Sequence, residues 1–233
     1  GVPVRPVRPM PFRWLARLAV AVALVGAAAA RLADFHVTLL NYVGLATLVA
    51  LGLVVMTGVA GIVSFGQQAF VGIAAYATAG LTTLMGASPW LGLAAGLALV
   101  ALVALLLGLV AVKLSGHYLS IATIAWGIAI YHLFGNLPAL GQYSGIDNVP
   151  SPAIGGWVLD TGRELFVLIW AATLAALLAA RNLLDSRPGR AIRALKSRAA
   201  MAESVGVDTA RMKVVIFLYA ALLAGISGWL YAH

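Results

Sequence analysis

The chain has 233 residues, of which 63% are hydrophobic and only 9% are charged. Soluble domains are about 45–50% apolar and about 25% charged, so this composition excludes a water-soluble globule and a disordered chain. Cysteine is absent, which excludes disulfides, thiolate metal sites and a cysteine nucleophile. The formal net charge of +8 does not indicate nucleic acid, because the basic residues cluster beside hydrophobic segments.

The apolar residues are grouped into segments long enough to cross a membrane. From Phe35 to Val112 there are 78 consecutive residues without Asp, Glu, Lys or Arg. A helical crossing needs about 20 apolar residues, whereas a spanning strand needs about 10 that alternate. We therefore expect an all-α, polytopic membrane protein with about seven transmembrane helices. The expected apolar stretches are 15–31, 38–60, 67–86, 90–112, 117–135, 164–181 and 214–233.

Charge asymmetry predicts the orientation. After a basic N-terminal segment, 1–14, seven crossings divide the 15 Lys and Arg residues into 13 on the N-terminal side and 2 on the other. Basic residues concentrate on the cytoplasmic side, so we expect a cytoplasmic N-terminus, an external loop 136–162 and a cytoplasmic loop 185–213. A cleavable signal peptide is the alternative interpretation of the first stretch, since arginines precede an apolar core and four alanines.

A glycine-rich segment, 58–68, interrupts the long uncharged run. Each glycine weakens a helix by about 1 kcal/mol relative to alanine. One interpretation is a short cytoplasmic turn in which Gln67 and Gln68 are wetted. The other is a broken helix beside a translocation path, because irregular backbone survives in a membrane only where protein or a water-filled cavity provides hydrogen-bond partners.

Sequence motifs for catalysis are missing. The chain has no G-x-S-x-G nucleophile motif and no G-x-x-x-x-G-K-[ST] phosphate loop. Its histidines show no H-E-x-x-H spacing, so a metal site is not expected. Small residues at Gly92 and Gly96, and at Ala221 and Gly225, instead have the spacing that lets helices approach closely. We expect a chain that is not an enzyme and that hydrolyses no ATP by itself.

The loop 185–213 contains a predicted amphipathic helix. Pro188 suits a first helical position, Gly206 suits the end of the helix, and Asp208 suits the cap of the next one. The stripe of small apolar residues consists of Ile192, Leu195, Ala199 and Ala202, and basic side chains occupy another face. The helix could lie on anionic lipid. Its small stripe argues instead for docking in a groove of a cytoplasmic partner.

Several motifs together resemble those of branched-chain amino acid ABC transporter permeases of the LivM type. The stretch 187–213, beginning R-P-G-R-A-I-R-A-L-K, resembles the cytoplasmic loop of the family. The stretch 66–76 looks like its glycine-glutamine segment, and 116–124 is similar to its G-x-Y-F-A-I-x-T segment. The sequence 141–146 only approximates the usual T-x-G-x-x-G run. The final crossings of the family are missing after Tyr231, so we expect a C-terminally incomplete chain.

This resemblance implies ATP-driven import of branched-chain amino acids across the bacterial inner membrane. The implied partners are a second permease subunit, two ATP-binding subunits that carry ATP and Mg²⁺, an external solute-binding protein and membrane lipid. The implied ATPase-coupling residues are Gly189, Arg190, Arg193, Ala199, Glu203 and Gly206. A zwitterion with an aliphatic side chain could cross between hydroxyl, amide and aromatic groups without a fixed charge in the path. The candidate path residues chosen on this ground are Ser64, Gln67, Gln68, Tyr76 and Thr123.

Two other functions compete with this interpretation. A permease of the same family for urea, amides or another small polar solute would share the cytoplasmic loop. A self-sufficient channel or secondary transporter would need ionisable coupling groups within the membrane, and the uncharged run contains only His36 at its edge.

Overall fold

The computed structural model describes residues 20, 23, 26, 27, 31–114, 117–186, 188–193 and 208–233. Within these residues six helices are long and apolar enough to cross a membrane. They are α2 (Asp34–Leu53, continued as a π-helix over Val54–Val59), α3 (Gln67–Met85), α4 (Pro89–Lys113), α5 (His117–Asn136), α6 (Gly162–Asp185) and α8 (Thr209–Tyr231). The predicted polytopic helical fold is confirmed, whereas most of the first predicted stretch, 15–31, lies outside the described residues.

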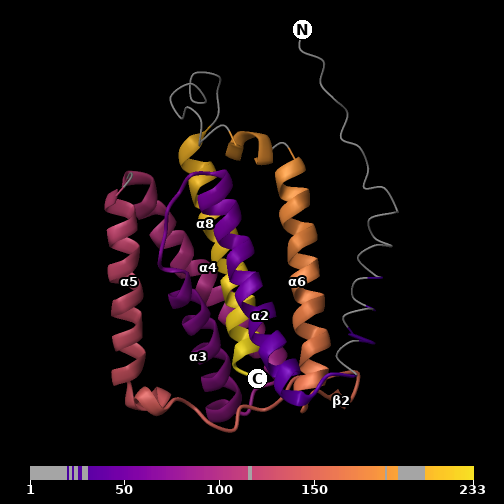
Figure 1. Cartoon of the computed structure of the whole chain (residues 1–233). Helices are drawn as coiled ribbons and strands as arrows, with labels where there is room; N and C mark the ends of the chain where they lie inside the picture. Colours follow the sequence, from indigo (N-terminus) through magenta and orange to yellow (C-terminus); the bar gives the residue numbers. More distant parts are fainter. Residues whose placement is uncertain are drawn as a thin grey trace.

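The bundle is arranged around α8. This helix packs against α2, α3 and α4, while α6 packs mainly on α2 and α5 contacts mainly α3 (Figure 1). The main core lies where these helices meet and includes fully buried Met56, Phe70 and Phe217. A second core cluster, which includes Leu48 and Ile169, joins α2, α6 and α8.

Small residues allow the helices around α8 to approach closely. A Cβ atom at Gly92 would lie 2.9 Å from the Thr78 side chain of α3, and one at Gly96 would lie 3.3 Å from a carbonyl oxygen of the same helix. A Cβ atom at Gly225 would lie 3.0 Å from Leu97 of α4. The predicted packing roles of Gly92, Gly96 and Gly225 are therefore confirmed, because atoms of a neighbouring helix occupy the space that a larger side chain would need.

At the starts of three helices a side chain caps a backbone amide that has no partner within the helix. The Ser88 hydroxyl accepts a hydrogen bond from the Leu91 amide, and Pro89 occupies the first turn of α4. Thr161 and Glu164 form a reciprocal capping box at the start of α6. The predicted cap at Asp208 is confirmed, since its carboxylate accepts a hydrogen bond from the Arg211 amide at 2.9 Å.

The loop between α5 and α6 is ordered by short elements and tryptophan contacts. It contains 3₁₀ turns over Pro138–Leu140 and Gln142–Ser144, and a hairpin pairing β1 (Ala153–Ile154) with β2 (Trp157–Val158). The indole of Trp90 donates a hydrogen bond of 2.8 Å to the carbonyl of Ala153, so the hairpin is fixed at the start of α4.

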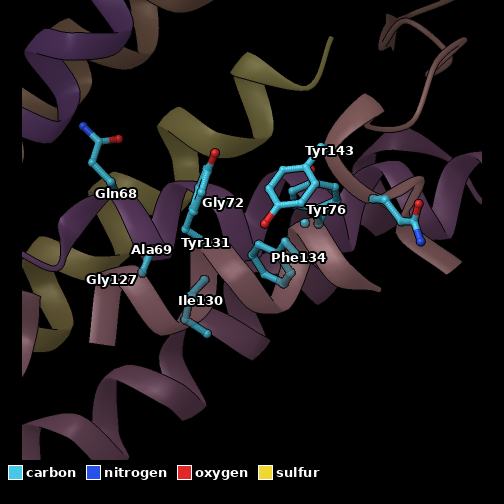
Figure 2. Close-up of a pocket in the computed structure, with 11 residues that line it drawn as sticks. Gln68, Ala69, Gly72, Tyr76, Gly127, Ile130, Tyr131, Phe134 and Tyr143 are labelled. Atoms are coloured by element: carbon cyan, nitrogen blue, oxygen red, sulfur yellow. The ribbon is translucent and has the colours of Figure 1, made fainter. Parts of the chain in front are cut away.

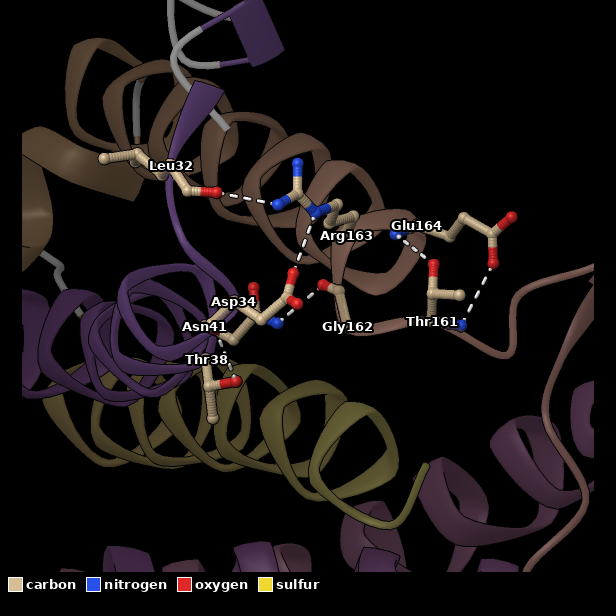
Figure 3. A network of polar contacts seen from close by, with 8 residues as sticks. All are labelled: Leu32, Asp34, Thr38, Asn41, Thr161, Gly162, Arg163 and Glu164. Carbon is tan, nitrogen blue, oxygen red and sulfur yellow. Dashed lines mark hydrogen bonds and ion pairs between the residues drawn. The ribbon is translucent and has the colours of Figure 1, made fainter. Parts of the chain in front are cut away.

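Polar contacts at the same end join α2 to α6 (Figure 3). Arg163 donates to the Asp34 carboxylate at 3.0 Å and to the Leu32 carbonyl at 2.7 Å. The Asn41 amide donates to the Gly162 carbonyl at 2.9 Å. These bonds set the two helices at the same depth, because all of them link the first turns of α6 to the first turns of α2 or the residues just before it.

The structure separates the loops into two groups. The start of α2, the turn between α3 and α4, and the 136–162 loop lie at one end of the bundle (Figure 1). The end of α2, the end of α4, the start of α5 and the end of α6 lie at the other. Because this grouping matches the one used to count basic residues, we name the first end the outer end and the second the inner end.

Candidate functional site

The chain is not helical between α2 and α3, over residues 60–66. The α2 helix first widens into a π-helix, and the Ala60 and Ile62 amides then donate to carbonyls of Val55 and Met56. The segment turns back from the inner end into the bundle before α3 begins (Figure 1). Gly61 has φ +75°, a left-handed conformation that glycine adopts without strain. Single π-turns of this kind are frequent at functional sites.

Contacts with α5 hold this broken segment inside the bundle. The Phe65 amide donates a 3.1 Å hydrogen bond to the hydroxyl of Thr123, which itself donates to the Ser120 carbonyl. A Cβ atom at Gly66 would lie 3.0 Å from the Thr123 carbonyl oxygen. These contacts favour the broken-helix interpretation over the short wetted turn, since they bury backbone that would otherwise be exposed.

Gln67 and Gln68 are adjacent in sequence but lie in different environments. Gln67 is 3% exposed and its amide nitrogen lies 3.8 Å from the Met56 sulfur. Among the described residues its amide oxygen has no hydrogen-bond partner. Gln68 is exposed and lies on the same face of α3 as Gly72 and Tyr76 at intervals of four residues. The expectation that both glutamines are wetted is therefore wrong for Gln67.

The face formed by Gln68, Gly72 and Tyr76 borders a cavity of about 270 Å³ between α3 and α5. Figure 2 shows Gln68 at one end of this cavity and the rings of Tyr76, Phe134 and Tyr143 gathered at the other. The Tyr76 and Phe134 ring centroids are 4.6 Å apart. The Tyr143 hydroxyl lies 3.3 Å from the His132 ring, a contact that holds the loop against α5.

A larger cavity of about 610 Å³, here called the inner groove, lies between α2, α3 and α8. Its lining includes Tyr42, Ala50, Gln68, Tyr76 and Tyr231. A cavity of about 230 Å³, here called the outer vestibule, lies beneath residues 145–149 of the 136–162 loop and shares Tyr76 and Tyr231 with the inner groove. The described residues that line these two spaces are all uncharged.

The five predicted path residues therefore form two groups. Gln68 and Tyr76 line the cavities. Ser64, Gln67 and Thr123 are buried at 3%, 3% and 4% exposure and support the broken segment. A direct role for these three in transport stays a prediction. The sequence interpretation missed the lining residues Tyr42 and Tyr231, because tyrosines near the ends of apolar stretches are typical of membrane interfaces.

The inner end presents the second candidate site, around residues 188–193. Gly189 is buried, its amide donates to the Ser186 hydroxyl at 3.3 Å, and a Cβ atom there would overlap with the carbonyls of Leu183 and Leu184. Arg190 and Arg193 are exposed. The predicted coupling residues Ala199, Glu203 and Gly206 lie outside the described residues.

One part of the predicted docking stripe is wrong. Ile192 was expected to face a partner's groove, yet its side chain is fully buried in the main core of this chain. At this position the helical stretch 188–193 therefore packs into the main core of the bundle. Its free face at this turn carries Arg190 and Arg193, so charge rather than apolar surface is available to a partner here.

Comparison with known families agrees with this architecture. Residues 35–233 match the family described as "Branched-chain amino acid transport system / permease component". The chain belongs to this permease family. It is therefore a multi-pass component of a membrane transport system, and its family role is transport rather than catalysis.

Two curated relatives carry more specific names. They are the "High-affinity branched-chain amino acid transport system permease protein LivM" of Salmonella typhimurium and the protein of the same name from Escherichia coli. Each is 30% identical over 153 residues, which cover 54% of this chain and 36% of the relative. The matched region thus spans about a third of the length of these relatives. No solved structure matches the chain at a significant level.

Proposed function

We propose that the chain is a transmembrane permease subunit of an ATP-binding cassette importer for branched-chain amino acids. The observation that carries this proposal is the match to the permease family over residues 35–233. The uncharged cavities beside the broken start of α3 provide the route: a zwitterion with an aliphatic side chain needs apolar walls with a few polar groups. The chain itself carries no phosphate-loop motif, so partner chains supply ATP hydrolysis.

The proposed complex contains a second permease subunit, two cytoplasmic ATP-binding subunits and an external solute-binding protein. Its proposed orientation places the N-terminus and the inner end in the cytoplasm of a bacterial inner membrane, because the crossings predicted from the sequence assign 13 of the 15 basic residues to that side. Arg190 and Arg193 form the exposed, described part of the surface that contacts an ATP-binding subunit, and the buried Gly189 contributes by letting this turn lie against the end of α6. Import of urea, amides or another small polar solute is the alternative within the same family.

The decisive experiment is co-purification with candidate ATP-binding subunits, followed by ATP hydrolysis in liposomes that also hold the second permease and the solute-binding protein. We expect hydrolysis to rise when leucine, isoleucine or valine is added with the binding protein. Stimulation by urea or an amide alone would favour the alternative substrate. Hydrolysis that no solute changes would contradict the proposed import function.

The docking surface is tested by charge reversal at its exposed arginines. The double variant Arg190→Glu, Arg193→Glu should insert normally and lose the ATP-binding subunits on purification, because both side chains are exposed and neither supports the core. Lys113→Glu is the matched control, since Lys113 is an exposed basic residue at the same end of the bundle, on α4. Equal retention of the ATP-binding subunits by both variants would contradict the docking role.

A further inference from the structure

Three tyrosines surround the junction between the inner groove and the outer vestibule. Tyr76 and Tyr231 line both spaces, and the ring centroids of Tyr42 and Tyr231 are 6.3 Å apart. They come from α2, α3 and α8, so the junction forms only where these three helices meet. We name Tyr42, Tyr76 and Tyr231 the tyrosine cluster.

The surroundings of the cluster are apolar and uncharged. Between the cluster and the inner end, the groove is lined by aliphatic residues of α2 and by Gln68 of α3. On the other side, the vestibule is lined by Ala79 and by Gly145, Ile146 and Val149 of the external loop. No carboxylate stands among the described residues lining either space, so a cation at this point has only ring faces, hydroxyls and amide groups as partners.

We infer that the tyrosine cluster is a recognition site for the ammonium group of an amino-acid substrate. An aromatic face carries negative potential and attracts an ammonium ion within about 6 Å of the ring centroid. Several rings around one site act together, as in the aromatic cages that bind quaternary ammonium groups. The amide of Gln68, deeper in the groove, is able to donate a hydrogen bond to a carboxylate.

The absence of a carboxylate from this lining suits transport better than tight binding. A fixed carboxylate would hold an ammonium group strongly, whereas conduction requires a site from which the solute can leave. Each ring face attracts an ammonium group only weakly in an exposed position. The cluster thus favours solutes that carry an ammonium group over urea and amides, which carry none.

This inference rests on the proposed function, because it takes the inner groove as the route of the substrate. Its test therefore measures binding preference in the groove and does not require import. The chain lacks cysteine, and Ala50 of α2 lines the groove, so Ala50→Cys provides a single thiol there. In the full-length protein in liposomes, its reaction with a cationic trimethylammonium methanethiosulfonate is compared with that of an anionic sulfonate analogue. Each rate is divided by the rate of the same reagent with a free thiol in solution.

We expect the normalised rate of the cationic reagent to exceed that of the anionic reagent. The ratio of the cationic to the anionic rate should fall about two- to fivefold in Tyr231→Leu. Tyr231→Phe should keep the ratio, because the ring remains. Tyr231 is 59% exposed, so its replacement leaves the core intact. Tyr76→Leu provides a second variant. A cysteine at Ser151 in the external loop is the control, and its ratio should not change with either tyrosine.

The results separate this inference from the proposed function. An unchanged ratio at Ala50→Cys in both leucine variants, or no reaction with either reagent, would overturn the ammonium site. A preference for the cation that the leucine variants abolish, in a complex that imports no amino acid, would support the site and contradict the proposed import.

Discussion

The α8 and α5 helices have similar lengths, 23 and 20 residues, and both are apolar enough to cross a membrane. Yet 61% of the residues in the most apolar stretch of α8 are buried within the protein, against 17% of those in the most apolar stretch of α5. The difference follows from small residues: Ala220, Gly225 and Gly228 let three helices approach α8, whereas a Cβ atom at Gly127 of α5 would meet no neighbour. Hydropathy therefore indicates which segments cross, while small residues decide which of them lies at the centre.

The largest effect is expected at Gly228 of α8. In Gly228→Ala the new Cβ atom would overlap with the Val71 carbonyl of α3, and backbone cannot move aside as a flexible side chain can. Overpacking of this kind costs about 1–3 kcal/mol or more, so the purified protein should melt at a clearly lower temperature in detergent. An unchanged melting temperature would show that α3 and α8 are not in close contact.

The second effect concerns the few contacts that α5 does make. Thr123→Val keeps the shape of the side chain but removes the acceptor for the Phe65 amide. A buried amide left without a partner costs about 1–3 kcal/mol, so stability should fall and the 60–66 segment should exchange its amide hydrogens faster. Thr123→Ser keeps the hydroxyl and should restore most of the loss. Equal behaviour of the two variants would mean that the hydrogen bond does not hold the segment.

The third effect is expected at Gly127, the counterpart of Gly228 on α5. Alanine is preferred to glycine in a helix by about 1 kcal/mol, and nothing lies within 4 Å of the new Cβ atom. Gly127→Ala should leave stability unchanged or raise it by up to about 1 kcal/mol, as read from thermal melting. A strong destabilisation by this variant would reveal a helix packed against α5, and the contrast with α8 would then disappear.

The smallest effect is expected at the outer end, where Arg163 joins α6 to α2. The Asp34 side chain of this ion pair is 89% exposed and that of Arg163 is 41% exposed. Pairs of this kind contribute about 0–1 kcal/mol and weaken with salt. Arg163→Ala should therefore lower the melting temperature slightly at low salt and less at high salt. A large loss that salt does not change would indicate that the bond to the Leu32 carbonyl is the important contact.

Much of the fold was predictable from local sequence signals. The 136–162 loop lies between the end of α5 at Asn136 and the start of α6 at Gly162. The cap at Asp208 and the packing faces at Gly92 and Gly225 are confirmed, because capping and close helix approach depend on one or two residues of defined chemistry. The burial of Ile192 in its own chain was not predictable, since an apolar stripe does not reveal which surface covers it.

The candidate site shows the same division between local and distant information. The sequence indicated that glycines and polar groups over 58–68, including Ser64 and Gln68, interrupt an apolar run and that the helix could break there. The sequence could not show that Gln67 faces the core while Gln68 faces a cavity. Which side chain faces which way depends on where α3 begins, and the contact of Phe65 with Thr123 sets that start. Nor could it bring Tyr42 together with Tyr231, which lie 189 positions apart in the chain.

The sequence by itself determined the membrane-spanning helical character, the separation of the loops into two groups and the resemblance to the permease family, because these depend on composition, local charge and short motifs. Only the tertiary structure decided that α8 is central, that Ile192 is buried within the chain and that three tyrosines meet at the junction of two cavities. The physical reason is that apolar length alone drives a segment into a membrane, whereas the position of each face depends on which neighbouring helix can approach it.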